Sequence, residues 1–360
     1  MTQDRLSVVL SHVVAWPEVT RGAERYVHEL GAVLQARGHR VRILTTSEHT
    51  RRDAVLGVPV RGFARGPLTG RLRARTQLRY GARCLADVLP RRVDVWHAGS
   101  LYDAAAAAVA GTVRPGLRTV LTLHGPVEHR VRDLAPHKQA LRIAARVDEV
   151  VCVSAAAARQ AREAAGFSAT VVPPGVDAGA FTPGPLRSPT PVLLYVGALT
   201  SPRKNVALLL AAAALVPDLE VHLVGQGDPD RWIAAAPDDV RGRVRHLGVL
   251  EGDDLVAAYR RAWATALVSE REVFGMSVVE SLACGTPAVV LDDGWGPSGI
   301  VTDGTGVRAE ATPEGVADAV RAALELTRDP ATSDRCRAAG ERYDWGTQVV
   351  PRLEEVYRGG

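Results

Sequence analysis

The chain has 360 residues, of which 46% are hydrophobic and 23% are charged, and its formal net charge is +4. This length suggests two domains of ordinary size, and the hydrophobic content excludes an intrinsically disordered chain. The charge is divided unevenly, because residues 1–180 hold 26 basic and 15 acidic side chains whereas residues 181–360 hold 18 and 25.

Strand-like apolar runs alternate with helical patterns in the first half of the chain. We predict a first helix at residues 22–37 and strands at residues 6–11, 40–45, 93–97, 118–124 and 149–154. This alternation is typical of a parallel sheet that helices cover on both faces. A stretch rich in proline and glycine follows at residues 174–190, and we interpret it as a linker.

The same alternation begins again after the linker. We predict strands at residues 192–196, 220–224, 244–247, 264–268 and 288–291, and helices at residues 205–216, 253–261 and 276–284. The expected fold is therefore α/β, with Rossmann-like, doubly wound domains at residues 1–173 and 191–344 on either side of a cleft. Ligands of such sheets bind at the carboxyl ends of the strands, so we expect the chemistry at turns from strand to helix.

The turn after the predicted strand at residues 264–268 holds the clearest candidate site. Two carboxylates, Glu272 and Glu280, lie eight residues apart on either side of a helix start that includes Phe274, Gly275 and Met276. Free backbone N–H groups and the helix dipole favour an anion at such a place. A pyrophosphate could bind there while the carboxylates bind sugar hydroxyls. The alternative is a helix-stabilising glutamate and an ordinary surface glutamate.

With the Ala-Cys-Gly-Thr-Pro segment that follows, this pattern resembles the signature of glycosyltransferase family 4, retaining enzymes of the GT-B fold. Other segments resemble motifs of that family in the expected order: Arg21-Gly-Ala-Glu-Arg-Tyr26, Arg37-Gly-His39, Asp94-Val-Trp-His97, Thr122-Leu-His-Gly125, Pro174-Gly-Val-Asp177 and Arg203-Lys-Asn205. The resemblance covers nearly the whole chain. It implies an N-terminal acceptor domain, a C-terminal domain that binds a nucleoside diphosphate sugar, and a last helix, at residues 345–358, that crosses back to the N-terminal domain.

The resemblance gives each candidate residue a role. Lys204 and Arg203 would hold the donor diphosphate, and Glu280 would bind the nucleotide ribose. Glu272 would contact the donor sugar, and His124 would meet that sugar from the N-terminal domain. The other donor contacts would come from Gly22, Gly225, Phe274, Gly275 and Met276.

Two of these residues also have simpler interpretations from the sequence alone. Lys204 fits a solvated lysine at a helix start, and His124 fits a polar residue that ends a strand. A functional role for Lys204 is favoured because a lysine there opposes the helix dipole. It is also favoured because Lys138 is the one other lysine in the chain.

The implied reaction moves a sugar from a nucleoside diphosphate sugar, with UDP favoured over GDP, to an acceptor hydroxyl. The resemblance implies front-face attack with retention and no metal. The nucleotide sugar is a co-substrate, so no cofactor is expected. The acceptor could be a small molecule, a natural product or a lipid-linked compound, and no nucleic-acid partner is expected.

Three positions depart from the family pattern. Ala198 stands where the family has an arginine, Arg21 replaces a glycine, and Gly299 replaces an acidic residue. These departures leave the donor open. They also keep two alternatives open, a nucleotide-sugar epimerase of the same fold and a non-catalytic partner protein that has lost donor binding.

Residues 71–83 contain a basic stripe. Arg71, Arg75, Arg79 and Arg83 recur at every fourth residue, as on one side of a helix, and Leu72, Leu78, Ala82, Leu85 and Leu89 could face the core. Such a helix could contact anionic lipid. The alternative is a solvated helix in an arginine-rich protein.

The cysteines and the apolar runs indicate the compartment. Cys84, Cys152, Cys284 and Cys336 are widely spaced, which predicts free thiols in a reducing environment. No apolar run reaches the about 18 residues of a membrane span, and the first residues do not resemble a signal peptide. We therefore expect a cytoplasmic protein that could act at the inner face of the membrane.

Overall fold

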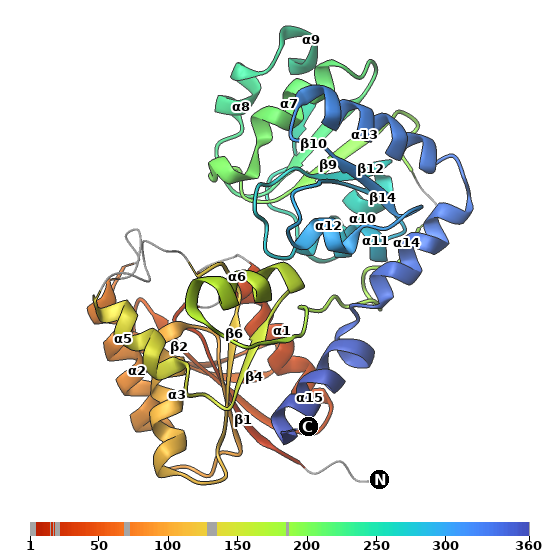
Figure 1. Ribbon diagram of the computed structural model, residues 1–360. Helices are drawn as coiled ribbons and strands as arrows, with labels where there is room; N and C mark the ends of the chain where they lie inside the picture. The colour runs from red at the N-terminus through yellow and green to blue at the C-terminus, as the bar shows by residue number, and fades with distance from the viewer. Residues whose placement is uncertain are drawn as a thin grey trace. The chain divides into compact units, whose positions relative to one another are not determined.

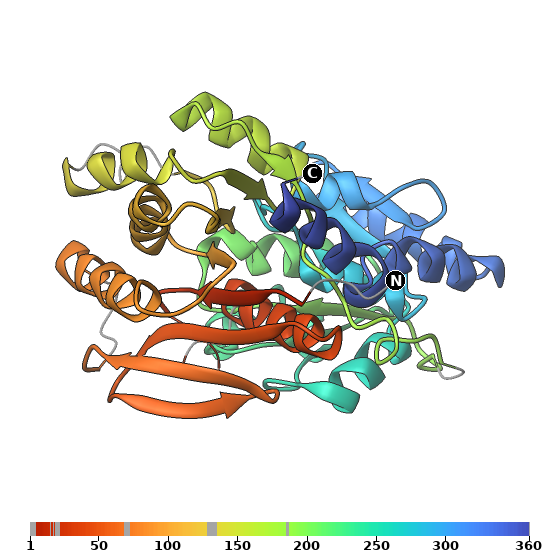
Figure 2. The same ribbon diagram turned by 90° about the horizontal axis from the view of Figure 1, so that it is seen from below.

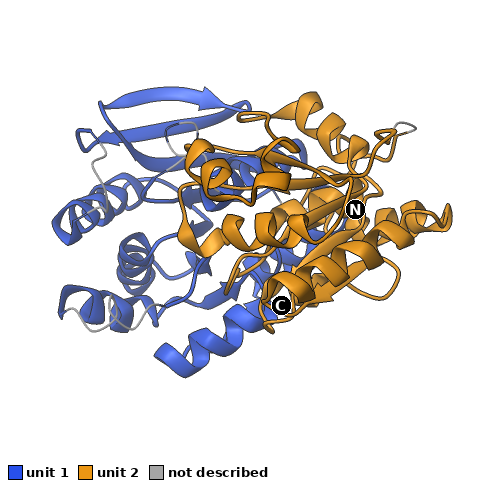
Figure 3. Ribbon diagram, turned by 90° about the horizontal axis from the view of Figure 1, so that it is seen from above, with its two compact units in different colours: residues 1–174, 345–360 blue, residues 175–344 orange. Residues whose placement is uncertain are grey.

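The computed structural model of the chain describes residues 5–14, 16, 18, 22–67, 73–127, 135–184 and 187–359. The chain divides into two compact units (Figure 3). Unit 1 contains residues 1–174 and 345–360, and unit 2 contains residues 175–344. The C-terminal segment is thus part of the unit in which the chain begins, and the stretch interpreted as a linker lies in unit 2 from residue 175 onward.

Unit 1 is built on an eight-stranded sheet with the order β3-β4-β2-β1-β5-β6-β7-β8. Its strands are parallel except β3, which pairs antiparallel with β4. The strands are β1 Ser7–Ser11, β2 Arg40–Ser47, β3 Arg51–Val55, β4 Val58–Ala64, β5 Val95–Ala98, β6 Arg118–Leu123, β7 Glu149–Cys152 and β8 Thr170–Val171. The doubly wound α/β architecture predicted for the first domain is confirmed.

Helices cover both faces of this sheet, because successive strand residues point to opposite sides. Val8 and Leu10 pack with α1 and the C-terminal helix, whereas Val9 packs with α2 and α3 on the other face. Figure 1 shows α1 and α15 on one side of the sheet and α2 and α3 on the other. The helices are α1 Gly22–Ala36, α2 Ala74–Val88, α3 Leu101–Val113, α5 Ala135–Ala144, α6 Ala155–Ala165 and α15 Val350–Arg358, the last preceded by a π-helical turn at Trp345–Val349.

The β3–β4 hairpin at the edge of this sheet was not predicted (Figure 2). Its two-residue turn is formed by Leu56 and Gly57, which have φ angles of 50° and 76°. Leucine seldom adopts a positive φ, whereas Asn-Gly or Asp-Gly is the usual signal for a tight hairpin turn. The turn therefore left no recognisable mark in the sequence.

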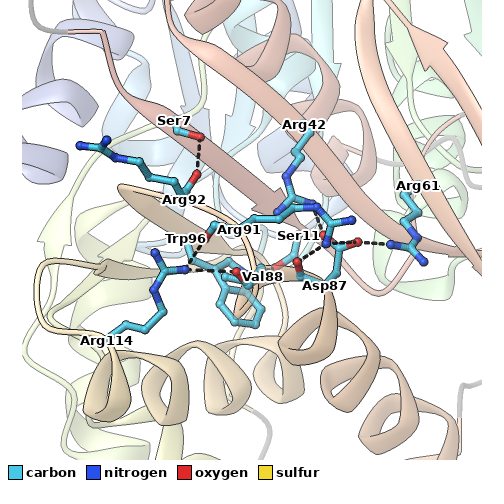
Figure 4. A network of polar contacts seen from close by, with 10 residues as sticks. All are labelled: Ser7, Ser11, Arg42, Arg61, Asp87, Val88, Arg91, Arg92, Trp96 and Arg114. Atoms are coloured by element: carbon cyan, nitrogen blue, oxygen red, sulfur yellow. Dashed lines mark hydrogen bonds and ion pairs between the residues drawn. The ribbon is translucent and has the colours of Figure 1, made fainter.

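A buried carboxylate fastens the end of α2 to the sheet (Figure 4). Asp87, whose side chain is 2% exposed, is ion-paired with Arg42 of β2 and Arg61 of β4, and its Oδ2 lies 3.2 Å from Arg91. A buried charge requires such partners. Arg114 adds a hydrogen bond of 3.1 Å to the Val88 carbonyl at the end of the helix.

The helix α2 turns a different face to the core than the sequence suggested. Its buried residues include Tyr80, Cys84 and Val88, which lie four residues apart, whereas Leu78 is 63% exposed. Ala82 is also exposed, Leu85 is half-buried and Leu89 is 37% exposed, and Leu72 lies outside the described residues. The tyrosine hydroxyl donates to the Leu44 carbonyl, so a polar aromatic residue occupies the place expected for leucine.

Unit 2 contains a six-stranded parallel sheet with the order β11-β10-β9-β12-β13-β14. Its strands are β9 Val192–Val196, β10 Glu220–Val224, β11 Val244–His246, β12 Ala264–Leu267, β13 Ala288–Leu291 and β14 Gly306–Ala309. The five predicted strands are present within one residue of their expected ends. The strand β14 was not predicted, because it is short and contains Gly306 and Arg308.

The helices of unit 2 follow its strands in a βαβ pattern. They are the 3₁₀ turn Pro202–Lys204 and the helices α7 Val206–Ala214, α8 Asp230–Ala235, α9 Asp238–Arg241, α10 Gly252–Arg261, α11 Met276–Ala283, α12 Gly296–Ile300, α13 Pro313–Leu326 and α14 Ala331–Glu341. One apolar core joins the sheet to α7 and α13. The turns at the carboxyl ends of β9 and β12 carry most of the candidate site residues.

Candidate functional site

The turn between β12 and α11 holds the two glutamates that the sequence singled out. Glu272 lies in the loop, and Glu280 lies inside α11, which begins at Met276. The preceding Gly275 has a φ of 101°, and a Cβ there would lie 3.0 Å from two neighbouring side chains. Glycine alone adopts this conformation without strain in so confined a place, so the helix entrance depends on it.

Phe274 and Met276 flank this glycine. The Phe274 side chain is 6% exposed, and its ring lies 5.6 Å from that of Tyr343. This side chain therefore serves the core of unit 2, and a donor contact at Phe274 would come from its backbone. Met276 is half-buried at the first turn of α11.

Glu280 is not the surface glutamate of the simpler interpretation. It is 4% exposed, and its Oε2 accepts a hydrogen bond of 2.7 Å from the Tyr259 hydroxyl of α10. A buried carboxylate is costly unless it is hydrogen-bonded. The tyrosine therefore holds Glu280 in place, and the sequence offered no signal that would have identified Tyr259.

Lys204 and Glu272 are brought together although they lie 68 residues apart. The Lys204 Nζ is 2.5 Å from Glu272 Oε2, and the two side chains are 23% and 18% exposed. Lys204 ends the 3₁₀ turn after β9, while Glu272 follows β12, which is the neighbour of β9 in the sheet. Two adjacent strand ends thus place a cation and an anion in direct contact.

Two hydrogen bonds join the segments that carry this ion pair. The Glu270 N–H donates to the Arg203 carbonyl at 2.9 Å, and the Arg203 guanidinium donates to the Arg271 carbonyl at 3.3 Å. Asn205 and Arg271, which adjoin Lys204 and Glu272 in the chain, both have a φ of 50°. Non-glycine residues in this conformation carry backbone strain and occur often at functional sites.

Gly225 at the end of β10 is required by close packing of two strand ends. A Cβ there would lie 2.0 Å from the Gly197 carbonyl oxygen, and the φ of Gly225 is 143°.

Two of the departures from the family pattern, Ala198 and Gly299, are also in unit 2. A Cβ at Gly299 would meet nothing within 4 Å, so the place of the missing acidic residue is open.

His124 follows β6 in unit 1 and contributes to a small pocket. The pocket is lined by residues at the ends of β1 and β5 and by α1: Leu10, Ser11, Tyr26, Val27, Leu30, His97, Gly99 and His124. The imidazole Nε2 of His124 is buried and has no hydrogen-bond partner among the described residues. A polar atom without a partner at a strand end is suited to bind a ligand.

Burial and neighbouring histidines keep this imidazole neutral. Burial is the main cause that lowers the pKa of His124 well below its ordinary value, and His12 and His97 lower it further. The ring packs edge-on against Tyr26, with centroids 4.6 Å apart. Neutral His124 can therefore donate one hydrogen bond and accept another.

The remaining predicted positions lie elsewhere in unit 1. Gly22 is exposed and is the first residue of α1, whereas Arg21 and Arg71 lie outside the described residues. Arg75, Arg79 and Arg83 lie on α2 and are exposed, as is Leu78. The structure thus brings Arg203, Lys204 and Glu272 together in unit 2, while His124 and Gly22 belong to unit 1.

The described residues offer neither a metal cluster nor a membrane-spanning helix. No group of three His, Cys, Asp or Glu side chains there could hold a metal ion. No helix in the same part of the chain is long and apolar enough to cross a membrane. The four cysteines are buried free thiols, as predicted.

Two protein-family models match the chain. Residues 20–179 match the model for glycosyltransferase family 4, and residues 190–326 match the model for group 1 glycosyl transferases.

Curated relatives match along most of the chain. It is 30% identical to a phosphatidyl-myo-inositol mannosyltransferase of Mycolicibacterium smegmatis, over 94% of this chain and 90% of the relative. It is 28% identical to a D-inositol 3-phosphate glycosyltransferase of Kineococcus radiotolerans, with the same shares covered.

Solved structures agree in fold at lower sequence identity. The sucrose-phosphate synthase of Thermosynechococcus elongatus superimposes with a TM-score of 0.81 and 20% identity, covering 98% of both chains. Anabaena HepE in complex with UDP-glucose superimposes with a TM-score of 0.75 and 20% identity, covering 98% of this chain and 100% of HepE. On these matches and on its two parallel-sheet units, the chain belongs to glycosyltransferase family 4 and is a glycosyltransferase of the GT-B fold.

Proposed function

We propose that the chain transfers a glycosyl group from a UDP-sugar to an acceptor hydroxyl with retention of the anomeric configuration and without a metal. The observation that carries this proposal is the contact between Lys204 and Glu272 beside Arg203. A diphosphate needs cations, and a sugar needs hydrogen-bond acceptors for its hydroxyls. This part of unit 2 offers both.

Donor binding would exchange the partners of the ion pair. In the free protein the Lys204 ammonium is neutralised by Glu272 at 2.5 Å. A bound diphosphate would supply the anion in its place, which would free the Glu272 carboxylate to accept hydrogen bonds from sugar hydroxyls. The lysine would then stabilise the charge that develops on the leaving diphosphate in the transition state.

The chemical step balances without a protein base. The bond from the anomeric carbon to the diphosphate oxygen breaks while a bond from that carbon to the acceptor oxygen forms on the same face. The acceptor hydroxyl passes its proton to the departing diphosphate. The protein therefore needs to position the two substrates and stabilise the leaving group.

His124 would contribute a neutral hydrogen bond to the donor sugar. Its pKa is lowered by burial, so the imidazole adds no positive charge beside an oxocarbenium-like transition state. Its unpartnered Nε2 is the atom available for a sugar hydroxyl.

The relatives support a donor and an acceptor class. UDP-glucose is bound in the solved HepE complex, and two relatives are named for acceptors that contain inositol and phosphate. We therefore propose a UDP-sugar as donor and a phosphate-bearing polyol as acceptor, free or attached to lipid. The basic character of residues 1–180 would attract such an anion.

A donor and acceptor screen tests this function. Purified protein is incubated with UDP-, GDP- and ADP-sugars, with myo-inositol, with inositol phosphate or without an acceptor, and nucleotide release and product anomer are measured. We expect UDP release that requires inositol phosphate, yields a retained anomer and persists in EDTA. An epimerised UDP-sugar without an acceptor, an inverted product or a strict metal requirement would contradict the proposal.

We also propose that α2 contacts anionic lipid at the inner face of the membrane. Arg75, Arg79 and Arg83 are exposed on this helix, and Leu78 is 63% exposed among them. A basic helix surface with an exposed apolar side chain is suited to a lipid interface.

A further inference from the structure

Three buried polar side chains connect the C-terminal helix to the strand that precedes His124. The Tyr357 hydroxyl of α15 lies 2.7 Å from His97 Nδ1, and His97 Nε2 lies 2.5 Å from the Thr122 hydroxyl. The three residues are 3%, 3% and 1% exposed. A continuous hydrogen-bonded path thus runs from α15 through β5 to β6.

The direction of each hydrogen bond follows from the buried phenol. Burial raises the pKa of Tyr357 well above its ordinary value, so its hydroxyl stays protonated and must donate. Among the described residues, His97 Nδ1 is the acceptor within reach. Burial also lowers the pKa of His97 to about 3, so the neutral ring has one proton. That proton is therefore on Nε2, which donates to Thr122.

The path ends beside His124. Thr122 belongs to β6, and His124 follows Leu123, the last residue of this strand. His97 and His124 line the same pocket together with Tyr26, whose ring centroid lies 6.5 Å from His97 and 4.6 Å from His124. The hydrogen bonds that orient His97 therefore affect the pocket that His124 also lines.

We propose that Tyr357 is a positioning residue, which acts through His97 and Thr122 to hold the end of β6 so that His124 meets the donor sugar. This inference rests on the role of His124 in the proposed function.

Replacement of one hydroxyl separates this role from simple packing. Tyr357→Phe retains the aromatic ring, whose edge-on contact with His97 has a centroid distance of 5.7 Å, but removes the donor to Nδ1. His97 then has no partner that fixes its tautomer. Tyr80→Phe is the matched control, because Tyr80 is equally buried in unit 1 and donates to the Leu44 carbonyl away from the path.

A double-mutant cycle with His124→Ala tests the proposal on the full-length chain. We expect Tyr357→Phe to lower kcat roughly tenfold, with a loss of thermal stability no larger than that of Tyr80→Phe, whose kcat stays near wild type. In the His124→Ala background, Tyr357→Phe should cause no further loss. Equal losses of kcat in both backgrounds would overturn the proposal, as would an unchanged kcat in Tyr357→Phe alone.

A spectroscopic measurement keeps this test separate from that of the proposed function. In ¹⁵N-histidine-labelled protein, Tyr357→Phe should change the imidazole resonances of both His97 and His124, whereas Tyr80→Phe should change neither. If the wild type shows no glycosyl transfer, the proposed function fails. The resonances still show whether the Tyr357 hydroxyl influences His124 through the hydrogen-bonded path. An unchanged His124 resonance would then refute it.

Discussion

Lys204 has a local energetic cost that its proposed role in donor binding would explain. A lysine beside a helix start opposes the helix dipole, yet this one is placed there and is ion-paired with Glu272 at 2.5 Å. Asn205, the next residue, adopts a φ of 50°. These unfavourable features are explained when the ammonium serves a ligand.

The residue-scale prediction compares the two lysines of the chain. Lys204→Ala removes the cation that would stabilise the departing diphosphate, so we expect kcat/KM to fall by roughly 100-fold to 1,000-fold. Lys138→Ala, at an exposed position of α5, should leave activity near wild type. Steady-state nucleotide release measures both variants, and similar rates for the two would refute the assignment of Lys204.

His28 predicts how stability depends on pH. It is 1% exposed on α1, and its pKa is lowered to about 4, mainly by burial and then by Arg51, while Asp53 opposes the change. Between its ordinary value of 6.5 and about 4, the unfolded chain binds a proton that the folded chain does not, so stability must fall as the pH falls through this window.

The expected size of this effect can be measured with one substitution. His28→Leu has no titrating group, so its loss of unfolding free energy from pH 7 to pH 5 should be smaller than that of the wild type by about 2 kcal/mol. Urea unfolding at the two pH values gives both numbers. Parallel losses would show that His28 does not titrate as its burial requires.

At the scale of elements, α15 gives a role to the Arg37-Gly-His39 segment. Arg37 donates to both oxygens of Glu354 at 2.8 and 2.9 Å, and His39 lies 3.0 Å from the same carboxylate. Although burial acts to raise the pKa of Glu354, these hydrogen bonds leave it below its ordinary value. The segment after α1 therefore anchors the C-terminal helix to unit 1.

The element-scale prediction concerns the exposed arginines of α2. Replacement of Arg75, Arg79 and Arg83 by serine should weaken binding to vesicles that contain phosphatidylglycerol by about 1 kcal/mol per arginine. A triple serine variant at Arg241, Arg321 and Arg328, exposed arginines of unit 2, is the control. Co-sedimentation measures both variants. Equal binding of the two, or equal binding of the wild type to neutral vesicles, would refute the lipid contact.

At the scale of the whole molecule, each unit has its own core and its own charge. Unit 1 holds 28 basic and 16 acidic residues, and unit 2 holds 16 and 24. The uneven charge seen along the sequence thus becomes sharper once the C-terminal segment is counted with unit 1. A basic unit is suited to an anionic acceptor, and this agrees with the proposed polyol phosphate.

Because the two cores are separate, a core substitution in one unit should destabilise mainly that unit. Leu353 of α15 is fully buried in the core of unit 1, and Leu209 of α7 is fully buried in that of unit 2. Each leucine-to-alanine change should cost 2–5 kcal/mol, as is typical for buried leucines. Hydrogen-exchange mass spectrometry should show that Leu353→Ala loosens peptides of residues 5–174 and that Leu209→Ala loosens peptides of residues 187–344. Uniform loosening by both variants would contradict two independent cores.

The sequence by itself determined the α/β class, most strands and the family. Parallel strands buried on both faces are continuous apolar runs, which are readable one segment at a time. The Glu272 and Glu280 pattern was equally readable because its members are close in sequence and surround a helix start. The β3–β4 hairpin escaped prediction since its turn uses Leu56 at a φ of 50°, where no ordinary turn signal exists.

Only the tertiary structure decided which of these residues touch. Lys204 meets Glu272 because β9 and β12 are neighbours in the sheet, although α7, β10, α8, α9, β11 and α10 lie between the two residues along the chain. Tyr357 reaches His97 across 260 residues because α15 packs against the sheet of unit 1. Local patterns record which way a side chain faces, but contacts between distant segments depend on strand order and helix docking, which no short stretch of sequence encodes.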